Sequence, residues 1–139
     1  MAKRVLLDVK TTINGQDFSD HLAAVTWSIS SDETETTAFG TGWRSRIAGL
    51  KDASVTLSFH QDFATTGSGA VDQTVWNNFG SLATVVCTPT SSAVSASNPS
   101  YSGVFLVSQT AFGGNVGDLD TLEVTWPLAS GSGVTRGTA

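Results

Sequence analysis

Two histidines each stand close to a carboxylate in the sequence, and such pairs are common partners in general acid–base catalysis. Asp20 directly precedes His21, and Asp62 follows His60 by two positions. Neither pair is accompanied by a nucleophile motif; His21 falls in a predicted turn, and His60 falls on the polar face of a predicted strand. We therefore expect structural histidines, with a small β-fold hydrolase as a minor alternative, and predict that the chain is not an enzyme.

The single cysteine, Cys87, has no partner for a disulfide within the chain. It ends the apolar run 82–87, and neither histidine is adjacent to it in sequence, so no base that would activate a nucleophilic thiol is indicated. We predict a buried thiol that behaves as a small hydrophobic side chain.

Asp118 and Asp120 are the best candidates for a metal site. However, no third ligand follows at the spacing of a calcium loop, and no cluster of histidine and cysteine suggests zinc. The Gly-x-Gly pairs lack the Lys-Ser/Thr of a phosphate-binding loop and the strand and helix of a dinucleotide site. The sequence therefore predicts no metal and no cofactor.

The composition argues against several classes of protein. Charged residues make up only 14% of the 139 residues, against about 25% in typical domains. The net charge is −5, and residues 52–134 contain six acids but no Lys or Arg, so no basic surface for nucleic acid is predicted. Since no apolar run is long enough for a signal peptide or a membrane span, we expect a protein that is made in a cytoplasm and is soluble there.

Alternation of apolar and polar residues predicts most of the chain to be strand. The Asn14-Gly15 pair predicts a tight hairpin turn, a second turn is predicted at Ser31-Asp32, and the last two strands are predicted to pair as a hairpin. The predicted strands cover residues 5–13, 25–30, 53–63, 82–88, 101–110 and 119–128.

One helix is predicted from Ala70 to Phe79, because Val71, Val75 and Phe79 recur at a spacing of four. Ser68 is its predicted N-cap, and Gly80 suits the position after its C-terminal end. We predict a single, mainly β domain, an antiparallel β-sandwich or barrel with this short flanking helix. Its core covers about residues 5–128, and residues 129–139 form a flexible C-terminal segment.

Two consecutive segments do not fit a core. Residues 33–39 have strand propensity but almost no apolar side chain, so this strand must face water, a channel or a partner. Residues 40–50 read as a glycine-bounded loop, yet they include Trp43 and Ile47, which suggests that something packs on the loop.

Two stretches of sequence carry a family resemblance. The first runs from Ile13 through Asn14-Gly-Gln-Asp-Phe-Ser-Asp20 to the acidic, Thr-rich segment that ends at Phe39-Gly40. The second begins at Arg46 and contains Gly49-Leu-Lys-Asp-Ala-Ser-Val-Thr-Leu57. Together they resemble the N-terminal half of the major tail tube proteins of siphophages, and the resemblance extends over about residues 5–128.

The resemblance implies a structural virion protein whose β-sandwich subunits form hexameric rings that stack into the tube of a long phage tail. The loop at residues 40–50 would be the ring-stacking element, with Trp43 and Ile47 buried on assembly and Arg44, Arg46 and Lys51 paired with acids of the next subunit. The implied partners are further copies, a tape measure protein, a tail terminator and distal tail or tip proteins. Assembly would take place in the host cytoplasm.

A conduit for DNA should not bind the DNA that passes through it, because every neutralised phosphate adds affinity by releasing counterions. An acidic wall without Lys or Arg repels phosphates instead. Glu33, Glu35 and Glu123 each stand beside threonines and are the predicted lumen-facing acids.

The main alternative is a monomeric β-sandwich module that binds a ligand such as a carbohydrate. Its support is the low charge, the Ser/Thr content and Trp43, which lies outside the predicted core, unlike the three other tryptophans (Trp27, Trp76 and Trp126). Within the phage interpretation, a tube subunit and a ring of the tail tip or hub both remain open.

Overall fold

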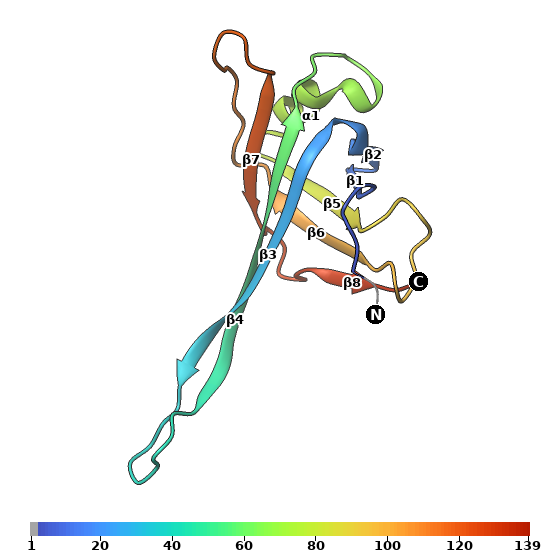
Figure 1. The fold of residues 1–139 in the computed structure, drawn as a ribbon. Helices are drawn as coiled ribbons and strands as arrows, with labels where there is room; N and C mark the ends of the chain where they lie inside the picture. The colour runs from blue at the N-terminus through green and yellow to red at the C-terminus, as the bar shows by residue number, and fades with distance from the viewer. Residues whose placement is uncertain (1–2) are drawn as a thin grey trace.

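The computed structural model describes residues 3–139, which form two antiparallel sheets, one α-helix and a long hairpin arm (Figure 1). The five-stranded sheet has the order β2-β1-β5-β6-β8, and the three-stranded sheet has the order β3-β4-β7. The predicted mainly β sandwich with one short helix is therefore confirmed. The strands are β1 (Lys10–Ile13), β2 (Gln16–Asp17), β3 (Leu22–Glu35), β4 (Arg46–His60), β5 (Leu82–Thr88), β6 (Ser100–Leu106), β7 (Thr121–Pro127) and β8 (Thr135–Gly137).

The core lies between the two sheets. Along β7, and along β4 from Ala53 to Phe59, every second side chain is buried, as the alternation predicts, and the side chains between them face outward. Full burial of a valine, leucine or phenylalanine side chain stabilises the fold by about 1.5–3 kcal/mol relative to leaving that side chain exposed. The central core residues are Val55, Leu57 and Phe59 of β4, Leu122, Val124 and Trp126 of β7, and Ala83, Val85, Cys87 and Phe105 of the other sheet.

The turn at Asn14-Gly15 is confirmed. Both residues have positive φ (51° and 86°), and they join β1 to β2 as a two-residue hairpin. The strand predicted over residues 5–13 is wrong in its first half, because β1 pairs with β5 only over residues 10–13. Val5 and Leu7 have no strand partner there and are exposed.

The predicted helix is confirmed as α1 (Val71–Asn78), with Val71 and Val75 buried and Gly80 at φ 81° after its end. Ser68 is not its N-cap: Ala70 takes that position without a side-chain hydrogen bond. The prediction that Trp76 faces the core is also wrong. Its side chain is 64% exposed and stacks on the neighbouring Phe79.

The turn predicted at Ser31-Asp32 is wrong, because β3 continues to Glu35 with only a bulge between Ser31 and Glu33. The loop predicted over residues 40–50 is wrong in its second half, because β4 already begins at Arg46. Residues 36–45 connect the two strands. Cross-strand hydrogen bonds hold this polar hairpin together, and hydrophobic periodicity cannot reveal such a contribution.

The predicted hairpin between residues 101–110 and 119–128 is wrong. β6 pairs with β5 and β8, whereas β7 pairs with β4 in the other sheet. The connection thus crosses from one sheet to the other, with a single bridge between Phe105 and Leu128. Within the segment 129–139, residues 135–137 form β8 and pair with β6.

Candidate assembly interface

The β3–β4 hairpin extends far beyond the sandwich as an arm (Figure 1). Every residue from 28 to 52 is exposed, although the strands remain paired as far as Glu35 and Arg46. The unpacked part of β4, residues 46–52, spans roughly 20 Å at about 3.3 Å per residue. We use "arm" for residues 28–52.

Large apolar side chains are distributed along the arm without cover from the rest of the chain. The sequence indicated Trp43 and Ile47, and these are 89% and 59% exposed. It missed Phe39, Leu50 and Ile29, which are exposed by 107%, 82% and 53%. Soluble monomers seldom display so many apolar side chains on one projecting element, so the arm has the character of an interaction surface.

The charged side chains of the arm lie beside one another. Arg44 Nε is 3.7 Å from Glu35 Oε1, and Arg46 Nε is 3.5 Å from Glu33 Oε2. All four side chains are about half exposed or more, and exposed pairs of this kind contribute at most about 1 kcal/mol. Two of the predicted lumen acids therefore sit next to two of the predicted stacking arginines. Lys51 lies opposite Ser31, closer to the sandwich.

Glu123, the third predicted lumen acid, lies on β7, away from the arm. It belongs to the outer side of the three-stranded sheet, which we call the hydroxyl face. Serine and threonine dominate this face, Thr56 Oγ1 and Thr125 Oγ1 are 3.1 Å apart on it, and it has no Lys or Arg. Its members are Ala24, Thr26, Ser28, Ser30, Asp52, Ser54, Thr56, Ser58, His60, Thr121, Glu123, Thr125 and Pro127, of which Ser28, Ser30 and Asp52 also belong to the arm.

The three-stranded sheet has two free edges, because β3 and β7 are its outer strands. Such edges can accept a further strand. One position on the β7 edge is occupied by Gln109, whose Oε1 accepts a hydrogen bond from the Thr125 N–H at 2.8 Å. The Gln109 carbonyl accepts a second from Trp126 Nε1 at 3.1 Å. No sequence pattern singled out this glutamine.

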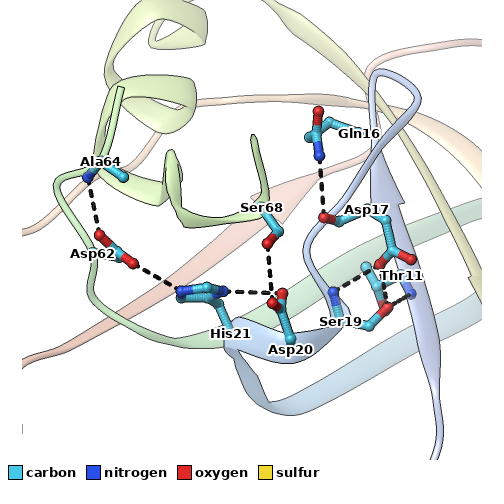
Figure 2. A network of polar contacts seen from close by, with 9 residues as sticks. All are labelled: Thr11, Gln16, Asp17, Ser19, Asp20, His21, Asp62, Ala64 and Ser68. Carbon is cyan, nitrogen blue, oxygen red and sulfur yellow. Dashed lines mark hydrogen bonds and ion pairs between the residues drawn. The ribbon is translucent and has the colours of Figure 1, made fainter. Parts of the chain in front are cut away.

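His21 bridges two carboxylates, as Figure 2 shows. Its Nδ1 lies 3.0 Å from Asp20 Oδ1, and its Nε2 lies 2.9 Å from Asp62 Oδ2. The hydrogen bond with Asp20, aided by that with Asp62, raises the pKa of His21, while the pKa values of both aspartates are lowered by their hydrogen bonds. Thus Asp62 pairs with His21, not with His60, its neighbour in sequence.

This His21 clamp has the geometry of a tie between two loops. Carboxylates engage both imidazole nitrogens, and the nearby Ser68 hydroxyl donates to Asp20, not to the imidazole. Asp62 Oδ1 also accepts from the Ala64 N–H at 2.9 Å. The clamp therefore fixes the short 3-10 turn at residues 19–21 to the segment that follows β4.

The predicted burial of Cys87 is confirmed. Its side chain is 6% exposed, its Sγ lies 3.2 Å from Thr11 Oγ1, and burial raises the pKa of the thiol. Among residues 3–139, no group of three or more metal-ligating side chains comes together, at Asp118 and Asp120 or elsewhere. Within the same range, no helix is long and apolar enough to span a membrane.

Four shallow surface hollows of about 260–350 Å³ are large enough for small ligands. One, of about 260 Å³, lies between the N-terminal segment around Leu6 and the start of β3 around Leu22. Another, of about 350 Å³, lies between β1 and residues 91–94. None of the four tryptophans lines any of these hollows.

Comparison with known proteins finds likeness in structure but not in sequence. No family model and no curated protein matches the chain. The tail of an empty gene transfer agent particle, solved with C6 symmetry, contains a chain with a TM-score of 0.67 and 17% identity over 96% of both chains. The SPP1 tail tube gives a TM-score of 0.71 and 12% identity over 95% of this chain and 77% of that one. The chain has the tail-tube fold.

The structural likeness to these two tail chains covers 95–96% of this chain, a larger share than the 5–128 range of the sequence resemblance. A chain in the baseplate of the anti-feeding prophage is also similar, with a TM-score of 0.54 and 10% identity over 98% and 97% of the two chains. Tubes and a baseplate thus share this fold. The fold alone therefore does not distinguish a tube subunit from a baseplate subunit, and the surfaces of the chain must make that distinction.

Proposed function

We propose that this chain is the repeating structural subunit of a phage-type tail tube. In this proposal, copies associate into hexameric rings, and the rings stack into a conduit through which DNA passes without specific binding. The observation that carries the proposal is the arm, which keeps two paired strands and several large apolar side chains outside the sandwich. A monomer gains nothing from this exposure, whereas a copy stacked on the arm would bury it.

The hydroxyl face is the proposed wall of the lumen. This face exposes serine and threonine hydroxyl groups and the carboxylates of Glu123 and Asp52 to solvent. It has no Lys or Arg that would hold phosphates. Glu33 and Glu35 belong to the arm, where their neighbours are arginines. We therefore assign the repulsion of DNA mainly to Glu123 and Asp52, and assign Glu33 and Glu35, beside their arginine neighbours, to contacts between rings.

Ring closure is proposed to use the free edges of β3 and β7. Adding a strand of the next subunit at each edge would continue the three-stranded sheet around a ring and leave no open edge. Sixfold closure is supported by the C6 symmetry of the gene transfer agent tail. The proposed partners beyond further copies are a tape measure protein, a terminator at one end and tip proteins at the other, all in the virion after assembly in the host cytoplasm.

Electron microscopy of the purified protein, at rising concentration and after salt and temperature shifts, tests the proposal. We expect hollow tubes or stacked rings of uniform width. The matched variant lacks the arm tip, with residues 37–44 replaced by a two-residue Asn-Gly turn, and should fold but form no stacks. A wild-type protein that stays monomeric throughout, and that binds glycans on an array, would instead support the monomeric binding module.

A further inference from the structure

A second group of exposed apolar side chains lies at the other end of the three-stranded sheet. Phe63 follows the end of β4, and Phe112, Val116 and Leu119 lie in the segment that leads into β7. Their side chains are 52%, 81%, 106% and 67% exposed, respectively. The Phe63 and Phe112 rings meet edge to face with centroids 6.0 Å apart. We call these four residues the distal cluster.

Polar contacts fix the chain shortly before each phenylalanine of the distal cluster. The residue before Phe63 is Asp62, which the His21 clamp fixes to the 3-10 turn. Three residues before Phe112, Gln109 is held by hydrogen bonds from two consecutive residues of β7. The two paired phenylalanines are therefore positioned before a partner binds, which lowers the entropic cost of binding.

We propose that the distal cluster is the acceptor for the arm tip, with Phe39 and Trp43, of a copy in the adjacent ring. This inference rests on the proposed function and names the surface that the arm contacts. The arm and the start of β7 lie at opposite ends of the molecule (Figure 1). A contact between two different surfaces at opposite ends repeats from copy to copy, which is the geometry of a stack and not of a closed dimer.

The charges of the two surfaces are complementary. Asp118 and Asp120 flank Leu119 in the distal cluster, and residues 53–134 contain no Lys or Arg. Residues 36–46 of the arm contain Arg44 and Arg46 and no acid. The contacts of these arginines with Glu35 and Glu33 are long and exposed, which leaves the guanidinium groups available to other partners. Apolar side chains framed by opposite charges favour this pairing over contact between two arms or two distal clusters.

A rival acceptor is the exposed patch of Trp76, Phe79 and Leu82 beside α1. This patch lies away from the three-stranded sheet, because Trp76 belongs to α1 and Leu82 belongs to the five-stranded sheet. The arm continues the three-stranded sheet, so moving a copy along those strands brings the arm tip toward the end of that same sheet. We therefore assign the distal cluster as acceptor.

Paired cysteines test the assignment. The double variant Trp43→Cys/Val116→Cys is assembled above the raised threshold concentration expected from the loss of Trp43. Mild oxidation of these tubes should give a ladder of covalent multimers on non-reducing gels. The two positions belong to the arm and to the loop that leads into β7, which lie at opposite ends of the molecule (Figure 1), so a cross-link within one chain is not expected. Each single variant should give no ladder, since native Cys87 is buried. The matched control is Trp43→Cys/Trp76→Cys, which reports the rival patch.

Tubes that form but give no ladder with Val116→Cys, or give one with Trp76→Cys, would overturn the acceptor while leaving the tube subunit intact. A wild-type protein that forms neither rings nor tubes would overturn both proposals. Charge provides a second readout: Asp120→Lys should raise the concentration needed for assembly about fivefold. Adding Arg44→Asp should restore it; failure of this rescue would contradict the charge pairing.

Discussion

The β3–β4 hairpin has two halves that differ in what covers them. In the sandwich half, β4 buries Val55, Leu57 and Phe59 against the opposite sheet, and polar side chains alternate with them. In the arm half the same two strands remain paired, yet every side chain is exposed. The comparison teaches that the ladder of hydrogen bonds sets the length of the hairpin. The contacts available to the side chains set where it is a core and where it is an interface.

The largest effect is expected from truncating a buried leucine of β4, and an exposed leucine in the arm half of the same strand provides the comparison. Leu57→Ala should lower the free energy of unfolding of the monomer by about 2–5 kcal/mol, because it opens a cavity in a close-packed core. Leu50→Ala, with 82% of its side chain exposed, should change it by less than about 0.5 kcal/mol. Urea unfolding at a concentration below assembly measures both, and equal losses would show that the arm packs on the monomer.

The second effect appears only on assembly. Trp43→Ala should leave monomer unfolding unchanged and weaken subunit association by about 2 kcal/mol or more, about thirtyfold in the concentration at which tubes form, because tryptophan is a frequent hot spot of interfaces. Light scattering against protein concentration measures this threshold. Trp76→Ala is the matched control, since Trp76 is also exposed but stacks within its own chain. An equal shift in both variants would contradict a specific role for the arm tip.

The third prediction concerns the end of the hairpin that the His21 clamp fixes. Because the pKa of His21 is raised in the folded chain, its contribution to stability is fully present below about pH 6.5 and is lost as pH rises through the raised value. The pKa values of Asp20 and Asp62 are lowered, so their contribution is present above about pH 4 and is lost in stronger acid.

Monomer stability should therefore fall as pH rises above about 6.5, by an amount that His21→Gln removes. Urea unfolding across this range measures the slope. His60→Gln should keep it, because His60 lies outside the clamp on the exposed end of β4. A slope that survives His21→Gln would assign the pH dependence to other groups.

The smallest effect is expected for the ion pair between Glu33 and Arg46. A double-mutant cycle with Glu33→Gln and Arg46→Gln should give a coupling of about 0.5 kcal/mol or less in the monomer, because both side chains are exposed. A larger coupling in the monomer would show that the arm is stabilised without a partner. A coupling that grows on assembly would identify the pair as part of the interface between copies.

Local physics allowed much of this fold to be predicted from the sequence alone. The alternation in β4 and β7 fixes which side chains face the core, the Asn14-Gly15 pair fixes a two-residue turn, and the spacing of Val71 and Val75 fixes the helix. Each of these features depends on neighbours within a few residues. Sequence also singled out Trp43 and Ile47 as apolar residues without a core to occupy.

Only the tertiary structure decided which segments meet. A strand pattern does not reveal its partner, so β7 was predicted to pair with the preceding strand although it pairs with β4. The strands of the arm have no buried face, and cross-strand pairing alone holds them together. Their extent therefore leaves no hydrophobic pattern in the sequence. His21 meets Asp62 and Gln109 meets Thr125 across long stretches of chain, and such contacts depend on how the sheets pack, which no local spacing encodes.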